Sequence, residues 1–251
     1  MATPIHFIHG GHPYEVAVRR ERRKDLRLKV RPPGVIVAVL PQKADIRLLE
    51  NFLERRRAEI GHYLDRLAAY EAQVRRYCFK EGEIITIAEK PFRIVVDAVK
   101  QGYEIKASLD GARGEIRLLS GAKPVKVPSL TYAEQAALAV EGVLMAYAKL
   151  WFSSRVEYYG QRMALTPKAV KISRAKTRYG SCSSRGNLNF CWRVLLAPQF
   201  VADYIVVHEL AHLAHLNHSK AFYAVVERAL PDYREAQKWL KANAALLEWP
   251  V

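Results

Sequence analysis

HELAHLAHLNH, residues 208–218, holds four of the eight histidines of this 251-residue chain. On an α-helix, residues four apart lie on one face, about 6 Å apart, so His208 and His212 can direct two imidazoles to one point. Such a pair suits a Zn²⁺ ion, which histidine nitrogens bind at about 2.0–2.1 Å. Glu209 completes the H-E-x-x-H arrangement, in which the glutamate is the general base that acts on a metal-activated water.

The spacing of apolar residues predicts the helix that carries these histidines. Pro198 can open this helix, because proline suits the first helical turn. Side chains then recur at three- and four-residue steps: Val201, Tyr204, Ile205, His208, Ala211, His212 and His215. The histidines therefore lie on the inward, apolar face. The alternative interpretation is a pair of structural histidines in the core.

A catalytic zinc keeps three protein ligands and one open position. The candidates for the third ligand are His215, His218 and Glu227. His215 lies about 10 Å along the helix axis from His208, a strained reach for a shared ion. Asn217 tolerates the left-handed conformation that ends helices, so the chain can turn back and place His218 over the metal. We therefore favour His218.

Two motifs together carry a family resemblance: KTRYGSCSSRGNLNFCWRVLLAP at residues 176–198 and HELAHLAHLNHSKAF at residues 208–222. The pair resembles the YgjP-like metal-dependent hydrolases, relatives of the SprT-like zincin metallopeptidases. The resemblance extends over about residues 20–245. It implies an α+β, zincin-like metallopeptidase fold and a third metal ligand at His218, which precedes a small residue and Phe222 in the family pattern.

The resemblance also implies a substrate-binding segment beside the metal, made of Arg178, Tyr179, Gly180 and Ser181. In zincins a strand at this place pairs with an extended peptide substrate. Tyr179 stands where many relatives have Trp. Gly180 suits a close backbone approach, or is an ordinary turn glycine. Cys182 is not needed as a nucleophile, because a metal and a glutamate suffice. Arg178 and Tyr223 are both candidates for stabilising the oxyanion.

The pattern divides the chain into a β-rich N-terminal half, residues 1–128, and a catalytic half, residues 129–251. Alternating apolar residues before and after Pro32-Pro33 predict two strands joined by a turn. Asp45 is expected to cap one long helix that reaches about Val74.

Residues 83–127 contain short β-branched runs separated by glycines, which predict an antiparallel meander. Lys123-Pro124 and Pro128 then indicate a linker. Thr131 and Glu134 form a capping box that begins a helix reaching about Tyr159. Two strands, 170–173 and 188–196, and a helix from the Ser219 cap to Leu230 complete the catalytic half.

Composition limits the class of protein. Half of the residues are hydrophobic, which is typical of a folded globular protein. Three cysteines without a C-x-x-C pair indicate a reducing compartment, and we expect a cytoplasmic location. We expect no signal peptide, no segment of about 18 apolar residues that would span a membrane, and no internal repeat. Nothing in the sequence predicts an oligomeric state.

Charge is strongly basic, with 40 Lys and Arg against 25 Asp and Glu, a net charge of +15. Residues 158–202 contain no acidic residue. Their basic residues are Arg162, Lys168, Lys171, Arg174, Lys176, Arg178, Arg185 and Arg193. Such a segment favours an anionic partner, such as nucleic acid or another polyanion. The alternative is a merely solvated basic surface.

The sequence therefore predicts a hydrolase with one Zn²⁺ per chain, held by His208, His212 and His218, with Glu209 as general base. Its expected substrate is a peptide or protein. A metal-dependent nucleotide phosphoanhydride hydrolase is the second candidate, and a nucleic-acid-associated protein with zinc is the third. Three good ligands beside a glutamate favour catalysis, because structural zinc sites usually have four Cys or His ligands.

Overall fold

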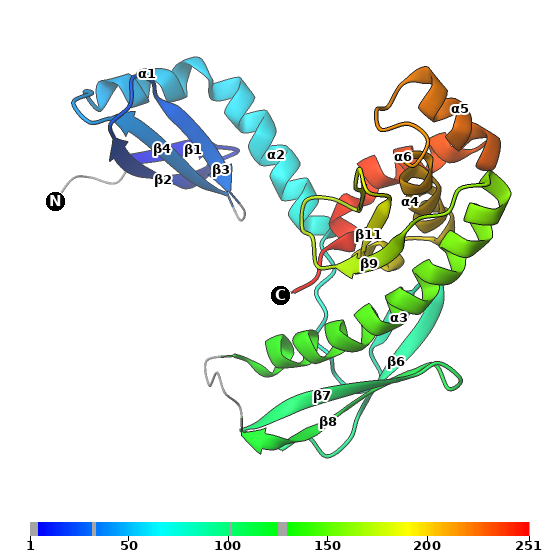
Figure 1. The fold of residues 1–251 in the computed structure, drawn as a ribbon. Coiled ribbons are helices and arrows are strands. Elements are labelled where there is room, and N and C mark those ends of the chain that lie inside the picture. Colours follow the sequence, from blue (N-terminus) through cyan, green and yellow to red (C-terminus); the bar gives the residue numbers. More distant parts are fainter. Residues whose placement is uncertain (1–4, 32–33, 101, 125–129, 251) are drawn as a thin grey trace. The chain divides into compact units, whose positions relative to one another are not determined.

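The computed structural model describes residues 5–31, 34–100, 102–124 and 130–250 (Figure 1). The chain forms two compact units, residues 1–74 and 75–251. The sequence-based division at residue 128 groups the strands of residues 84–124 with the N-terminal ones, whereas the compact units place them in the second unit. The predicted turn at Pro32-Pro33 and the predicted linker at Pro128 lie outside the described residues.

The first unit is a four-stranded sheet with helices packed against it (Figure 1). Its strands are β1 (Ile5–His9), β2 (His12–Glu21), β3 (Arg27–Arg31) and β4 (Val35–Pro41), in the order β1-β2-β4-β3. β2 and β4 run parallel, and the other neighbours run antiparallel. Leu26, Leu28 and Val30 pack against the buried core, as their alternation predicts.

The helical part of this unit consists of α1 (Arg47–Arg55) and α2 (Arg57–Gln73). The prediction of one continuous helix is wrong, because Arg56 has φ −103° and ψ 13° and interrupts it. Neither glycine nor proline marks the break, so residue type provides no signal for it. Asp45 does stabilise the start of α1, since its Oδ1 accepts a hydrogen bond from Arg47 N at 2.9 Å.

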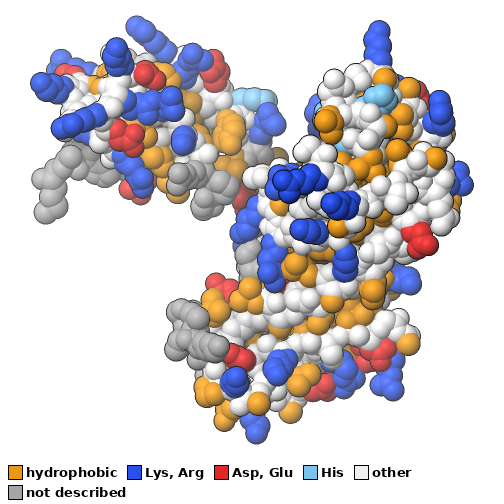
Figure 2. All heavy atoms as spheres, in the orientation of Figure 1, with side chains coloured by type: hydrophobic (Ala, Val, Ile, Leu, Met, Phe, Trp, Pro, Cys, Tyr) orange, Lys and Arg blue, Asp and Glu red, His pale blue; other side chains and the backbone are white. Residues whose placement is uncertain are grey.

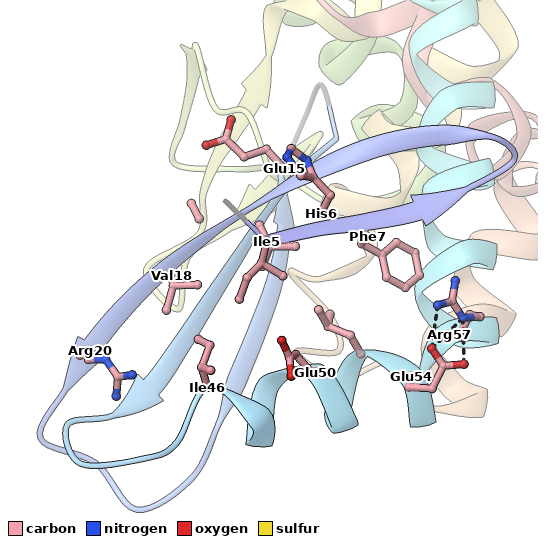
Figure 3. Close-up of a pocket in the computed structure, with 13 residues that line it drawn as sticks. Ile5, His6, Phe7, Glu15, Val18, Arg20, Ile46, Glu50, Glu54 and Arg57 are labelled. Atoms are coloured by element: carbon pink, nitrogen blue, oxygen red, sulfur yellow. Dashed lines mark hydrogen bonds and ion pairs between the residues drawn. The ribbon is translucent and has the colours of Figure 1, made fainter. Parts of the chain in front are cut away.

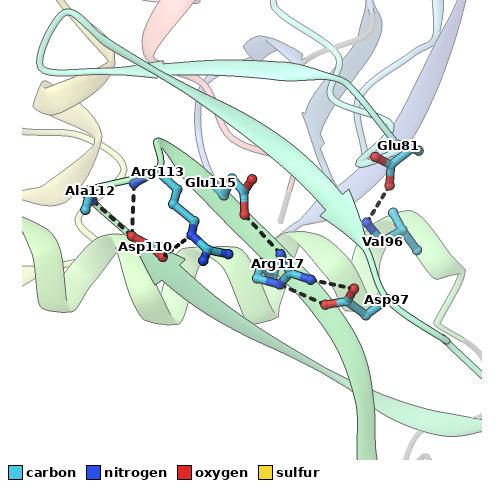
Figure 4. A network of polar contacts seen from close by, with 8 residues as sticks. All are labelled: Glu81, Val96, Asp97, Asp110, Ala112, Arg113, Glu115 and Arg117. Atoms are coloured by element: carbon cyan, nitrogen blue, oxygen red, sulfur yellow. Dashed lines mark hydrogen bonds and ion pairs between the residues drawn. The ribbon is translucent and has the colours of Figure 1, made fainter.

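The second unit contains another four-stranded sheet. Its strands are β5 (Ile84–Ile87), β6 (Lys90–Val96), β7 (Tyr103–Asp110) and β8 (Glu115–Pro124), in the order β5-β6-β8-β7. The predicted antiparallel meander is wrong at β6 and β8, which are neighbours and run parallel. In a meander β7 would lie between them, but here β7 pairs antiparallel with the other edge of β8. Arg117 on β8 binds Asp97 at 2.8 Å and Glu115 at 3.0 Å (Figure 4). Lys123-Pro124 belongs to β8 rather than to a linker.

A long helix, α3 (Tyr132–Met163), follows this sheet. The predicted capping box is confirmed, because Thr131 Oγ1 accepts a hydrogen bond from Glu134 N and Glu134 Oε2 accepts one from Thr131 N. α3 packs against β7, β9 and α4. Among the described residues it is also the one helix long and apolar enough to cross a membrane, with a mean hydropathy of 1.3 over an 18-residue window. The sequence-based expectation that no segment is long and apolar enough to cross a membrane is therefore wrong for α3, a helix that here contributes ten buried residues to the second unit.

The remaining elements surround one central helix. β9 (Ala169–Ser173), β10 (Gly180–Cys182) and β11 (Asn187–Cys191) form a small sheet in the order β10-β11-β9. Residues 192–196, predicted as strand, form the 3-10 helix η1 (Trp192–Leu196). The chain continues through α4 (Gln199–Ala211), α5 (Lys220–Ala229), α6 (Tyr233–Asn243) and η2 (Ala244–Leu247). The α+β class and the strand-rich N-terminal half are thus confirmed.

Candidate metal centre

α4 carries the first two histidines of the predicted centre and is buried on nearly every side. Helices α3, α5 and α6 and strand β10 all pack against it. Of its residues 201–211, only His208 is partly exposed. His212 follows the last residue of α4 with helical φ −66° and ψ −17°, so the four-residue spacing still applies. The centroids of these two imidazoles lie 4.9 Å apart.

After α4 the chain turns back and brings His218 to the same point. Its Nε2 lies 3.1 Å from Nε2 of His208, and the nitrogens available from the three histidines all lie within 4.8 Å of one another. Two nitrogens on one tetrahedral zinc are about 3.3 Å apart, so this cluster fits a metal ion. The predicted Ser219 cap is confirmed, because its Oγ accepts a hydrogen bond from Phe222 N.

Phe222 packs against all three imidazoles. The centroid of its ring lies 4.9 Å from that of His208, 4.6 Å from that of His212 and 4.9 Å from that of His218. Its side chain is fully buried. One apolar ring therefore restricts the rotamers of the whole cluster.

Hydrogen bonds orient the two imidazoles of α4. The Tyr204 hydroxyl lies 3.3 Å from Nδ1 of His208, and Gln237 Nε2 on α6 donates to that hydroxyl at 3.0 Å. Nδ1 of His212 lies 3.0 Å from the carbonyl oxygen of His215. When each Nδ1 carries the proton, each Nε2 presents its lone pair to the cluster, which is the arrangement that a metal needs.

Burial also favours the neutral form of these histidines. It lowers the pKa of His208 to about 4, and the charges of His212 and His218 contribute to this shift. Burial lowers the pKa of His212 as well, although the bond to the His215 carbonyl opposes the change. Neutral imidazole is the form that binds metals. The cluster is therefore prepared for a cation at neutral pH.

Glu209 lies beside the cluster with only 5% of its surface exposed. Its Oε2 is buried and has no hydrogen-bond partner among the described residues. Burial raises the pKa of Glu209 to about 7, and the positive charge of Arg178 opposes this shift. An unpaired buried oxygen is costly. This oxygen is therefore free to accept a hydrogen bond from a ligand or a reacting water.

Comparisons with known proteins identify the family of the chain. The family model of the YgjP-like metallopeptidase domain matches residues 24–243. The chain belongs to this family. The crystal structure of the metallopeptidase zymogen of Pyrococcus abyssi abylysin is similar at 23% identity, over 36% of this chain and 93% of that chain, with a TM-score of 0.34. No curated protein matches the chain.

Membership in the YgjP-like family makes the chain a metallopeptidase-type hydrolase, and the matched residues agree with the predicted extent of about 20–245. Such a domain implies a divalent metal and a peptide or protein substrate. The histidine cluster is where the structure offers a place for that metal.

The other two candidates for the third ligand lie elsewhere in this metallopeptidase domain. The side chain of His215 is not part of the cluster, and its carbonyl oxygen contacts His212 instead. Glu227 is exposed on α5 and pairs with Arg234 at 3.0 Å. Geometry therefore leaves His218 as the third member.

The predicted substrate segment runs along β10, which packs on α4. Arg178 is exposed just before the strand, whereas Tyr179, Gly180 and Ser181 are half-buried. Burial raises the pKa of the Cys182 thiol, and the nearby Glu209 charge adds to the shift. A protonated thiol is a poor nucleophile, which agrees with the view that Cys182 is not catalytic.

The residues that support His208 are not among the predicted site residues. Tyr204 belongs to the predicted inward face of the helix, and its four-residue spacing from His208 is a signal that could have indicated the contact. Gln237 lies 33 residues beyond Tyr204 on another helix, and no local pattern predicts that pairing.

Proposed function

We propose that this chain is a zinc-dependent metallopeptidase that holds one Zn²⁺ on His208, His212 and His218 and uses Glu209 as general base. The supporting observation is the convergence of three imidazoles beside a buried carboxylate, one oxygen of which has no hydrogen-bond partner in the described part of the chain. Structural zinc sites are usually closed by four protein ligands, whereas catalytic sites keep three and an open position.

A Zn²⁺ ion bound by these histidines would supply Lewis acidity, polarising the scissile carbonyl and lowering the pKa of water towards about 7. Glu209 has a pKa of about 7, which suits proton exchange near neutral pH. Its unpaired Oε2 accepts a proton from the attacking water. The same carboxyl then donates that proton to the leaving amine.

Strand β10 supports a peptide as the substrate. It is the edge of the sheet β10-β11-β9 and, among the described residues, pairs only with β11. An extended peptide can add to such an edge through backbone hydrogen bonds. Because β10 packs on α4, this edge would hold the peptide beside Glu209.

Replacing Glu209 by Gln tests the proposed base. The amide keeps the size of the side chain but cannot accept the proton, so hydrolysis of casein should fall by about 100-fold or more while zinc content is unchanged. Glu227→Gln is the matched control, because this exposed glutamate lies outside the cluster. Undiminished casein hydrolysis by the Glu209 variant would refute the mechanism.

Single alanine substitutions test the metal ligands by zinc analysis of the purified protein. His208→Ala, His212→Ala and His218→Ala should each remove tightly bound zinc. His215→Ala should retain it, because His215 contributes only its carbonyl. Retention by His218→Ala and loss by His215→Ala would reverse the assignment. Parallel assays with nucleoside triphosphates would identify a nucleotide hydrolase if casein were not cleaved.

A further inference from the structure

Gly180 lies against the side chain of Glu209. A Cβ atom added to Gly180 would be 2.5 Å from Oε1, 2.7 Å from Cγ and 2.9 Å from Cδ of Glu209. Contacts this short do not occur between non-bonded carbon and oxygen atoms, since carbon–carbon contacts are optimal at about 3.5–4.0 Å. The space that a side chain at position 180 would need is already filled by the carboxylate.

The backbone at Gly180 does not itself require glycine. Its φ lies outside the left-handed region, unlike those of Gly10, Gly11 or Gly186. It sits in β10 and pairs with Phe190 in an ordinary antiparallel register. Glycine inside a strand is unfavourable by roughly 0.5–1 kcal/mol relative to alanine. A turn conformation therefore does not account for this residue.

A close approach of the substrate backbone does not account for it either. The direction in which a Cβ would point leads to Glu209, and the three nearest atoms within 4 Å all belong to that side chain. A bound peptide cannot occupy the same volume. The neighbour that requires a glycine at this position is the carboxylate.

We propose that Gly180 is a positioning residue, which keeps open the space that the Glu209 carboxylate occupies beside the histidine cluster. The proposal rests on the role of Glu209 in the proposed function. Glu209 is almost completely buried on α4, so its carboxylate has little room to turn elsewhere. A methyl group at position 180 displaces the carboxylate, and none of the three atoms nearest to that methyl group belongs to a histidine.

Gly180→Ala is the direct kinetic test. The displaced base should lower kcat for a peptide substrate by about 10-fold or more, with KM changed by less than about threefold and zinc content unchanged. Gly142→Ala is the matched control, because a Cβ at that exposed position in α3 meets no atom of the described residues within 4 Å. A raised KM with unchanged kcat would overturn the proposal and assign Gly180 to substrate contact.

A thermal double-mutant cycle tests the same contact without any activity. Gly180→Ala should lower the Tm of the wild-type chain by about 2 °C or more. In a Glu209→Ala background the same substitution should leave the Tm unchanged or raise it, because the clash is gone and alanine reduces the entropy of the unfolded chain. Equal shifts in both backgrounds would overturn the proposal. An inactive wild-type protein would refute the proposed peptidase function and leave this cycle valid.

Discussion

The two four-stranded sheets, β1–β4 and β5–β8, have the same topology in the described residues. In each, the first strand pairs antiparallel with the second, the second runs parallel to the fourth, and the third pairs antiparallel with the fourth. A helical segment follows each sheet. The sequence shows no repeat, so this structural repeat is visible only in the strand order.

The two units differ in the continuity and the packing of the helical segment that follows each sheet. In the first unit, the helix after the sheet is broken at Arg56, and its ion pairs, Arg56–Glu59 and Arg57–Glu54, are exposed. A groove of about 870 Å³ remains between β1, β2 and α1 (Figure 3). In the second unit, η1 packs against both β5 and α3.

The unbroken helix α3 carries polar groups that reach the catalytic part of the second unit. Glu141 is buried and accepts hydrogen bonds from Trp192 Nε1 and Arg174 Nε, both at 2.9 Å. Arg155 pairs with the buried Asp203 of α4 through two hydrogen bonds of 2.7 Å. The same strand topology thus occurs in both units. Only in the second unit does the helix after the sheet bind a residue of α4, the helix that carries part of the candidate metal centre.

The largest expected effect concerns the buried pair. Asp203→Asn leaves the Arg155 charge without its partner and should lower the free energy of unfolding of the second unit by about 3 kcal/mol. Urea unfolding followed by tryptophan fluorescence reports on this unit alone, because all four tryptophans, Trp151, Trp192, Trp239 and Trp249, belong to it.

The matched change in the first unit is Glu54→Gln, which removes the exposed partner of Arg57. Water solvates both groups, so circular dichroism should detect no change in unfolding. Equal effects of Asp203→Asn and Glu54→Gln would contradict the contrast between the two helices.

An intermediate effect is expected at the support of His208. Tyr204→Phe removes the hydroxyl that contacts Nδ1 of His208 and should weaken zinc affinity by about 10-fold, the lower limit for such outer contacts. Competition with a chromophoric chelator measures this affinity. Tyr63→Phe, on the exposed side of α2 in the first unit, should leave it unchanged. Unchanged zinc affinity in Tyr204→Phe would show that Tyr204 and Gln237 do not support zinc binding by His208.

The smallest effect concerns the basic surfaces. Lys and Arg side chains outnumber acidic ones on the visible face of both units (Figure 2). The prediction that residues 158–202 recruit a polyanion needs two corrections. Arg193 is itself buried, and its Nη2 donates a hydrogen bond to the carbonyl oxygen of Ala175. Arg174 is not merely solvated but binds the buried Glu141. Arg174 must therefore stay in place when the charge is reduced.

Replacing Lys168, Lys171 and Lys176 together by Gln should flatten the salt dependence of single-stranded DNA binding. The log–log slope should fall by about 0.7 for each phosphate that the protein no longer neutralises. Fluorescence anisotropy at several salt concentrations measures the slope. The matched variant in the first unit replaces Arg19, Arg27 and Lys29 on β2 and β3. A slope that changes only in this second variant would place the polyanion site in the first unit.

Local patterns in the sequence were sufficient to predict much of the fold and the pairing of His208 with His212. The caps at Thr131 and Ser219, the alternation around Leu28 and the spacing of His208 and His212 each involve residues a few positions apart. Such contacts follow from helical and strand periods, which are properties of the chain itself. The turn expected at Asn217 and the family resemblance both then favoured His218, ten residues beyond His208.

Tertiary structure alone decided the pairings between distant segments. The parallel register of β6 and β8, the bond from Gln237 to Tyr204 and the contact of Gly180 with Glu209 join residues roughly twenty to more than thirty positions apart. No periodicity links such residues, because their contact depends on how whole elements pack. The sequence determined which side chains were available for the centre, and packing around α4 determined which of them meet.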